Sequence, residues 1–462
     1  MPISCNSPLP VIAYLRRMKF EDLNLNKPLL NALSDLGYNT PTTIQHKCFP
    51  VVMSGRDMIG IAQTGTGKTL GYLLPILRQW EFSKEKHTRV LILVPTRELV
   101  VQVVEAARKI STYMSVQIEG VYGGGNIKTQ MAALAGGADI VVGTPGRVID
   151  LIMNASLKIK TVKRLVIDEM DEMLGLGFRH QLTTILNLLP PKRQNLLYSA
   201  TFTDEVQTLS GDYFNGPVMV EAAPAGTPVD KISQRGYEVP NFNTKVNLLK
   251  LLLADAEMKK VLVFAATKAQ ADTLYELIEP AFAGTIGVIH SNKSQNNRFE
   301  TVRLFQNGTY RALIATDIIA RGLDIAEVSH VINFDVPEEP ENYIHRIGRT
   351  GRADKEGVAI TLIAPYEQER REAIENLMKQ SIPVAEVPEE LEISDVLVKE
   401  EMPNTETQNI QEKFKKRPTG GGAFHEKLEK NKKVNQHLTR AQKLKLKYGK
   451  PKTRGQKKKG GK

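Results

Sequence analysis

One short segment carries residues of the types that bind phosphate groups. Residues 62–69 read Ala-Gln-Thr-Gly-Thr-Gly-Lys-Thr. Glycines let backbone N–H groups turn toward phosphate oxygens, a lysine adds a compact positive charge, and a threonine hydroxyl can bind Mg²⁺. Ala62 stands where the phosphate-loop pattern usually has its first glycine. The segment still predicts a nucleoside triphosphate site, with Lys68 also contributing to catalysis; the predicted ligands are Thr64, Gly65, Thr66, Gly67, Lys68 and Thr69.

A pair of carboxylates follows a second apolar run, as a magnesium nucleotide site would require. Asp168 and Glu169 come directly after residues 165–167, which have the character of a buried strand. We predict that Asp168 binds Mg²⁺ together with Thr69, and that Glu169 orients or deprotonates the attacking water. An acidic turn that caps the following helix is the alternative. That alternative does not account for the phosphate-binding segment.

Both segments must follow a strand, and the surrounding sequence provides one in each case. Residues 57–61 form an apolar run before the phosphate-binding segment, and residues 70–77 have helix-compatible spacing, giving strand, turn and helix. Apolar runs alternate with longer helical stretches elsewhere, at residues 90–94, 140–142, 165–167, 260–264, 287–290 and 312–315. This alternation predicts parallel sheets that bind ligands at the carboxyl ends of their strands.

A segment with the composition of a linker divides this alternation of strands and helices into two parts. Residues 222–228 combine alanines with two prolines and a glycine. We therefore predict an α/β fold with two tandem parallel-sheet domains, at residues 18–221 and 231–385, joined by residues 222–230. A nucleotide cleft is expected between the two domains.

Positive charge is concentrated near the C-terminus. Residues 401–462 hold 19 Lys or Arg against 5 Asp or Glu, a net of +14, so the chain's net charge of +11 leaves −3 for residues 1–400. Residues 386–462 are predicted to be a low-complexity, basic and largely disordered tail. A cationic arm attracts nucleic acid through counterion release, without selecting a sequence. A solubilising tail with no partner is the alternative.

Composition favours a protein of the cytoplasm. The 462 residues are 41% hydrophobic, which is sufficient for the cores of two or three domains. Cys5 and Cys48 give no disulfide framework, so a reducing compartment is expected. No run reaches membrane-spanning length, and residues 1–17 lack the pattern of a secretion signal. Those residues are expected to be a disordered extension or to lie upstream of a true start at Met18.

Further segments match, in order, the motifs of DEAD-box ATP-dependent RNA helicases, a family of superfamily 2. The tetrad that names the family reads Asp168-Glu169-Met170-Asp171. Met170 replaces the usual alanine, and we expect its side chain to pack away from the nucleotide. The chain is similar to the bacterial RhlE-like type over residues 18 to about 370. The resemblance implies two RecA-like domains that use ATP and Mg²⁺ and bind single-stranded and duplex RNA.

The resemblance also implies roles for residues in the first half. Tyr38 is expected to stack on adenine, and Gln45 to read the edge of that base. Ser199 and Thr201 are expected to couple ATP hydrolysis to unwinding. Contacts with the RNA backbone are implied for Pro95, Thr96, Arg97, Gly123, Gly124, Thr144, Gly146 and Arg147.

In the second half, Arg349 and Arg352 resemble the arginines that reach the γ-phosphate from the opposite domain. A planar guanidinium spreads charge over phosphate oxygens as they gain charge in the transition state. Asp324 resembles the residue that meets the ribose. The resemblance also implies RNA contacts for Arg298 and Thr316. It implies roles in coupling ATP hydrolysis to unwinding for His345 and Arg346.

The implied function is RNA-stimulated ATP hydrolysis coupled to local, non-processive unwinding of RNA duplexes or remodelling of ribonucleoproteins. Contacts with the backbone predict little sequence selectivity. An ATP-gated RNA clamp or assembly platform shares the same motifs and remains an alternative. A superfamily 2 motor acting on DNA is a second one, which the adenine-reading segment and Met170-Asp171 argue against. We expect a monomer that binds no membrane and reaches ribosomal particles or other ribonucleoproteins through its basic tail.

Overall fold

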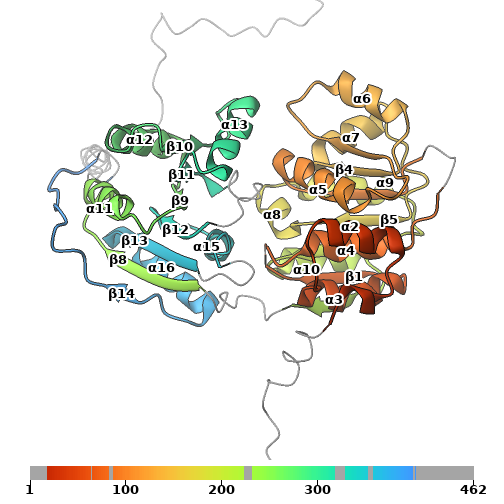
Figure 1. Ribbon diagram of the computed structural model, residues 1–462, viewed down its shortest axis with the longest axis horizontal. Coiled ribbons are helices and arrows are strands. Elements are labelled where there is room, and N and C mark those ends of the chain that lie inside the picture. The colour runs from red at the N-terminus through yellow and green to blue at the C-terminus, as the bar shows by residue number, and fades with distance from the viewer. Residues whose placement is uncertain are drawn as a thin grey trace, which may run out of the picture. The chain divides into compact units, whose positions relative to one another are not determined.

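The computed structural model describes residues 18–63, 65–82, 87–222, 232–317, 328–351, 357–398 and 401. Within these residues the strands form two seven-stranded sheets, each entirely parallel and each covered by helices (Figure 1). This confirms the predicted α/β fold with tandem RecA-like sheets. Thr64, Asp324 and Arg352 lie outside the described residues, as do the predicted extension 1–17, residues 223–230 of the predicted linker, and residues 402–462 of the predicted tail.

The first sheet has the strand order β3-β4-β2-β5-β6-β1-β7. Its strands are β1 (Met58–Ile61), β2 (Val90–Leu93), β3 (Ile118–Val121), β4 (Ile140–Gly143), β5 (Arg164–Ile167), β6 (Gln194–Ser199) and β7 (Val218–Glu221). The helices of this half are η1 (Phe20–Leu23), α2 (Lys27–Asp35), α3 (Thr43–Met53), α4 (Lys68–Arg78), α5 (Arg97–Ile110), α6 (Ile127–Ala135), α7 (Pro145–Met153), α8 (Met170–Gly175), α9 (Arg179–Leu188) and α10 (Asp204–Tyr213).

Alternate residues of each strand face two separate cores, because side chains on a strand point to opposite faces in turn. Met58 and Ile92 belong to a core that includes side chains of α2, α3, α4 and α5. Ile59 and Leu93 belong to the other core, with side chains of α7, α8, α9 and α10. Burial on both faces explains why these strands read as continuous apolar runs instead of alternating ones.

The strand order places two groups of strand ends next to each other at one edge of the sheet. β5, β6 and β1 are neighbours, and β3, β4 and β2 are neighbours beside them. Parallel strands all end at the same edge, so loops that are distant in sequence meet there. The phosphate-binding segment and the acidic tetrad follow β1 and β5, with β6 paired to both strands.

The second sheet has the order β10-β11-β9-β12-β13-β8-β14. Its strands are β8 (Ile232–Glu238), β9 (Val261–Phe264), β10 (Ile286–Ile289), β11 (Ala312–Ala315), β12 (His330–Asn333), β13 (Gly357–Ile363) and β14 (Val384–Ala385). The described helices are α11 (Phe242–Ala254), α12 (Lys268–Ile278), η2 (Glu279–Ala281), α13 (Gln295–Gln306), α15 (Pro340–Ile347), η3 (Pro365–Glu367) and α16 (Gln368–Met378). No helix among the described residues has the length and apolar character needed to span a bilayer.

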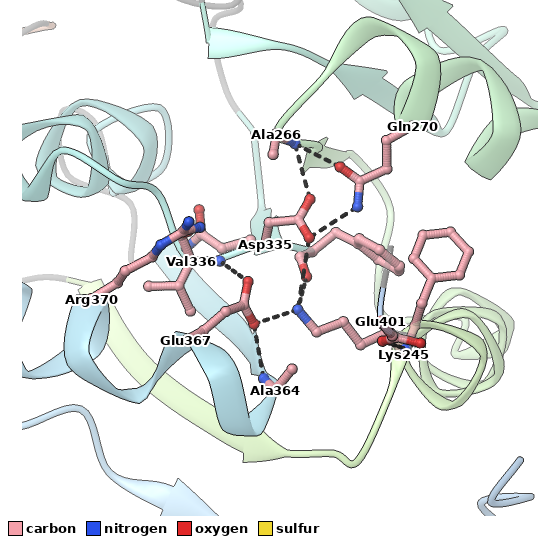
Figure 2. Close-up of polar contacts among 12 residues, drawn as sticks. Lys245, Ala266, Gln270, Asp335, Val336, Ala364, Glu367, Arg370 and Glu401 are labelled. Carbon is pink, nitrogen blue, oxygen red and sulfur yellow. Dashed lines mark hydrogen bonds and ion pairs between the residues drawn. The ribbon is translucent and has the colours of Figure 1, made fainter. Parts of the chain in front are cut away.

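A buried lysine joins several elements of the second half. The Lys245 ammonium on α11 lies 2.6 Å from the Glu367 carboxylate and donates over 2.8 Å to the Phe334 carbonyl (Figure 2). Both charged side chains are almost fully buried, and Asp335 lies 3.8 Å from the same ammonium. Burial raises the pKa of Glu367 more than Lys245 lowers it. Glu367 also accepts from the backbone N–H of Val336, so this pair fixes the chain where β12 ends.

Residues 386–398, which were predicted to open the tail, pack against the second half. Val387, Leu391 and Val398 contact the core beside α11. Amide side chains of that helix hold the segment in place: Asn243 donates to the Val396 carbonyl over 2.7 Å, and Asn247 to the Glu392 carbonyl over 2.8 Å. The apolar residues that make these contacts are interspersed with many acidic residues. The composition of the segment therefore indicated a tail.

Candidate active site

The phosphate-binding segment connects β1 to α4, and Lys68 is the first residue of the helix. Gly67, with φ of 89°, adopts the left-handed conformation just before it. Lys68 is only 6% exposed, and its ammonium has no hydrogen-bond partner. A buried ammonium without a hydrogen bond is costly, and a helix N-terminus attracts anions. The site therefore fits a ligand that brings negative oxygens to Lys68.

Gln45 supports the turn of this segment from the neighbouring helix α3. Its side-chain amide donates to the Gly67 carbonyl over 3.1 Å, and its oxygen accepts from the Thr42 N–H over 3.0 Å. A Cβ on Gly67 would collide with the Gln45 amide. The positive φ and this close approach both require glycine. Tyr38, between α2 and α3, is 50% exposed and leaves its ring accessible.

The two predicted carboxylates lie side by side at the end of β5. The Asp168 N–H continues the sheet by donating to the Leu93 carbonyl over 3.0 Å. Glu169 adopts a left-handed conformation with φ of 55°, and its N–H donates to Asp168 over 3.0 Å. Both side chains are buried, and the Glu169 Oε2 atom has no hydrogen-bond partner. A non-glycine residue strained in this way often marks a functional site.

The electrostatics at this point suit a bound cation. Burial raises the pKa of Asp168 to about 6, with Lys68 lowering it and Glu169 raising it. Carboxylate and hydroxyl oxygens are the ligands that Mg²⁺ prefers, and Asp168 with Thr69 provides both. The unpartnered Glu169 oxygen and Lys68 ammonium beside them fit a magnesium nucleotide.

Asp171, for which no separate role was predicted, brings three of the predicted coupling residues together. One of its oxygens accepts from the Thr201 N–H over 2.9 Å and from the Thr201 hydroxyl over 2.8 Å. The Asp171 N–H donates to the Ser199 hydroxyl over 3.3 Å. The His345 ring lies 3.6 Å from Asp171 and also 3.6 Å from Glu172. Burial would raise the pKa of Asp171, but His345, Lys68 and Thr201 hold it below its usual range.

Met170 packs as predicted. It is fully buried in the core on the α7–α10 side of the sheet. It contributes volume to that core, while Asp168 and Glu169 carry the polar groups of the tetrad.

The predicted RNA-binding residues of the first half follow three adjacent strands. Pro95, Thr96 and Arg97 follow β2, Gly123 and Gly124 follow β3, and Thr144, Gly146 and Arg147 follow β4. The Arg97 guanidinium lies against Gly124, where an added Cβ would collide with it. Arg147 donates to Gln130 over 2.8 Å and to the Gly125 carbonyl over 3.1 Å. The structure thus brings these residues to one edge of the sheet.

In the second half, the predicted residue Arg346 on α15 makes several hydrogen bonds. It makes two hydrogen bonds to the Asp317 carboxylate, of 2.6 and 2.8 Å, and donates to the Asp335 carbonyl over 2.7 Å. Arg349 follows the same helix and is 3% exposed. Thr316 is buried at the end of β11.

Arg298 has a partner that the sequence did not indicate. It lies on α13 and forms an ion pair of 2.6 Å with Glu98 on α5. Both side chains are less than a tenth exposed. Glu98 is adjacent in sequence to Arg97, a predicted RNA-binding residue. This adjacency was the signal in the sequence that could have pointed to Glu98.

The fold and the site together define a two-domain RecA-like protein with a phosphate-binding loop. Residues 42–209 match the family model described as DEAD/DEAH box helicase, and residues 244–354 match the helicase conserved C-terminal domain. The chain belongs to the DEAD-box family of ATP-dependent RNA helicases.

Curated relatives and a solved structure agree with this assignment. The chain is 40% identical over 369 residues to the RNA helicase CrhR of Synechocystis sp., covering 80% of this chain and 74% of the relative. It is 38% identical over 395 residues to the DEAD-box ATP-dependent RNA helicase CshA of Geobacillus kaustophilus, covering 85% and 84%. S. cerevisiae Dbp5 bound to RNA and ADP BeF3 is similar in structure, with a TM-score of 0.73 and 29% identity, over 80% of this chain and 95% of that one. The RhlE-like subtype stays a prediction.

Proposed function

We propose that this protein hydrolyses ATP when it is stimulated by RNA, and that it uses this cycle to separate short RNA duplexes or remodel ribonucleoproteins. The observation that carries the proposal is the unpartnered Lys68 ammonium next to the buried carboxylates of Asp168 and Glu169. RNA as the polymer is supported by the names of the relatives and by the RNA bound in the Dbp5 structure.

Nucleotide binding follows from the elements around α4. Lys68 neutralises the outer phosphates, and backbone N–H groups of Gly65, Thr66 and Gly67 surround their oxygens. Gln45 holds the Gly67 carbonyl, so recognition of adenine by its side chain would also set the shape of the phosphate-binding segment. The exposed Tyr38 ring offers a face on which the base can stack.

Hydrolysis requires a water held for attack and charge placed around the γ-phosphate. Glu169 orients the attacking water and accepts its proton, since its Oε2 atom has no other partner. Mg²⁺, bound by Thr69 and Asp168, would neutralise charge on the phosphate oxygens. Arg349 is assigned to the same oxygens in the transition state. Thr64, Asp324 and Arg352 have proposed roles in this site but lie outside the described residues.

Coupling between ATP and RNA is assigned to Asp171 and its partners. The carboxylate binds the segment after β6 through Thr201 and lies 3.6 Å from His345 of α15. It follows the water-activating Glu169 by two residues on the chain. A change of position at the tetrad would therefore be transmitted both to β6 and to the helix that leads to Arg346 and Arg349.

RNA binding is assigned to the edge of the first sheet after β2, β4 and β3, together with Arg298 and Thr316. Glycine N–H groups, threonine hydroxyls and arginines there suit phosphate and sugar, so little base selectivity follows. The basic tail adds affinity for RNA or ribonucleoproteins. We further propose that the protein acts as a monomer in the cytoplasm.

One experiment distinguishes an RNA-unwinding enzyme from an ATP-gated RNA clamp. A labelled short RNA duplex is mixed with a lower concentration of enzyme, in the presence of ATP or of a non-hydrolysable analogue. Displacement of many strands per enzyme with ATP supports the proposal. A single round of displacement, together with an ATP-bound RNA complex that outlives many hydrolysis times, would assign the chain to the clamp.

A further inference from the structure

Two loops that enter the first sheet carry positive charge at the edge opposite the predicted nucleotide and RNA sites. Residues 154–163 precede β5 and residues 189–193 precede β6, and neighbouring parallel strands begin at the same edge. Together the two loops hold five basic residues and no acidic one: Lys158, Lys160, Lys163, Lys192 and Arg193. Residues 1–400 as a whole carry a net charge of −3, so this concentration of one sign is local.

The first loop is anchored so that its lysines face solvent. The core on the α7–α10 side of the sheet includes three apolar residues of this loop, Leu157, Ile159 and Val162. The lysines between and beside them are exposed. The Thr161 hydroxyl donates to the Thr88 carbonyl over 2.9 Å, and the Lys163 N–H donates to the Arg89 carbonyl over 2.8 Å. Because the backbone is already fixed, less conformational entropy is lost when the lysines bind a ligand.

The second loop lies directly beside the first. The backbone N–H that opens β6 donates to the Lys163 carbonyl over 2.9 Å. Lys192 is exposed. The Arg193 guanidinium donates to the side-chain oxygen of Asn195 and to the Pro190 carbonyl, each over 2.8 Å. These two acceptors are uncharged, so the charge of Arg193 adds to that of the lysines.

The carboxylates that can be placed at this edge leave the lysines uncompensated. Asp57, before β1, is buried and accepts from the Asn195 N–H over 2.8 Å. Asp139, before β4, pairs with Arg89 at 3.0 Å, and Glu81 is exposed beside Arg89. Within the part of the chain that the structure describes, the lysines of the two loops make no ion pair. The uncompensated charge therefore lies before β5 and β6.

A group of exposed lysines suits the phosphates of RNA better than it suits a protein surface. Lysine is depleted in protein–protein interfaces, but it is a common phosphate ligand. β4 has four residues, so the predicted RNA-binding residues that follow it lie about 13 Å from the edge at which the two loops enter. An RNA strand that continues past those residues by several nucleotides is long enough to span this distance.

We propose that residues 154–163 and 189–193 form a second RNA-binding surface, which holds the phosphate backbone of RNA that flanks the segment bound after β2, β3 and β4. This inference rests on the proposed function, which assigns RNA to that first edge. The first edge offers glycine N–H groups, threonine hydroxyls and arginines, whereas the second surface offers mainly lysines. Lysines bind phosphate through charge and do not read bases, so the flank is held whatever its sequence.

The test measures the binding of single-stranded RNA to the full chain over a range of salt concentrations, in the presence of a non-hydrolysable ATP analogue. A short strand is compared with the same strand extended at both ends. The test variant combines Lys158→Gln, Lys160→Gln and Lys163→Gln. The control variant removes equal charge from exposed lysines outside the surface, through Lys27→Gln, Lys259→Gln and Lys379→Gln. Urea unfolding should give both variants the wild-type midpoint, because the substituted side chains are exposed.

The test variant should bind the extended strand more weakly than the wild type does. The steepness of log affinity against log salt concentration should fall by about 2, since each lost contact with a single strand contributes about 0.7. The short strand should bind equally to the wild type and to both variants, and the control variant should match the wild type for the extended strand as well.

Three results would overturn the inference. An unchanged salt dependence for the extended strand would leave the surface to an acidic protein partner. An equal loss in the control variant would assign the effect to net charge. An equal loss for the short strand would place the lysines at the first edge. If the wild type bound neither strand, the proposed function itself would fail, and the inference with it.

Discussion

Replacing Lys245 by methionine should destabilise the second half of the protein strongly, even though it lies outside the predicted nucleotide and RNA sites. The ammonium is fully buried, 2.6 Å from Glu367 and 3.8 Å from Asp335. Methionine fills a similar volume but leaves two carboxylates buried without their cation. Removing one partner of a buried pair typically costs about 3–5 kcal/mol. The hydrogen bond to the Phe334 carbonyl is lost as well.

The double substitution separates charge from packing. Lys245→Met combined with Glu367→Gln removes both members of the pair, so no carboxylate of that pair remains uncompensated. Glutamine has one oxygen, so it can accept from only one of the N–H groups of Val336 and Ala364, which now donate to separate Glu367 oxygens; the single Glu367→Gln variant shares that loss. The double variant should therefore lose less than the two single variants combined, by about 2 kcal/mol or more.

Urea unfolding of the full chain, followed by a probe in the second half, measures these free energies. Arg303→Met is the control, because Arg303 pairs with Glu300 on an exposed face of α13 and should leave the midpoint unchanged. The reasoning would be refuted if Lys245→Met lowered stability by less than about 1 kcal/mol, or if the two single effects were additive.

Three further predictions concern catalysis, metal binding and the tail. Glu169→Gln should abolish turnover while a fluorescent ATP analogue still binds with near wild-type affinity; normal turnover would remove Glu169 from the role of water activation. Because burial raises the pKa of Asp168 to about 6, protons should compete with Mg²⁺ below that pH. The apparent Mg²⁺ affinity should fall about tenfold per pH unit below pH 6 and stay constant above it, and a flat profile from pH 5 to 7 would contradict this. Removing residues 402–462 should weaken RNA binding and flatten its salt dependence with basal ATP hydrolysis intact, and an unchanged salt slope would exclude the tail as an RNA-binding arm.

Local signals explain what could be predicted from the sequence. The phosphate-binding segment needs a strand, a glycine turn and a helix in a continuous stretch, and all three can be read between residues 57 and 77. Both sheets follow in the same way, because strands buried on two faces are apolar without interruption. Met170 could be assigned to packing since Asp168 and Glu169 already provided the polar groups.

The missed features depend on contacts between distant residues. Glu367 lies 122 residues beyond Lys245, and nothing local distinguishes this lysine from one on the surface of a helix. Asp171 belongs to the tetrad, but its bonds to Thr201 exist only because β5 and β6 are neighbours.

The central claim is that this chain couples ATP hydrolysis to RNA, and the most direct measurement is steady-state ATP hydrolysis by the full chain. The rate is measured without nucleic acid, with single-stranded RNA, and with single-stranded DNA of matched length, for the wild type and for Glu169→Gln. We predict strong stimulation by RNA alone in the wild type and none in the variant. Equal stimulation by DNA would indicate a DNA motor, and no stimulation by either polymer would contradict an RNA-dependent ATPase.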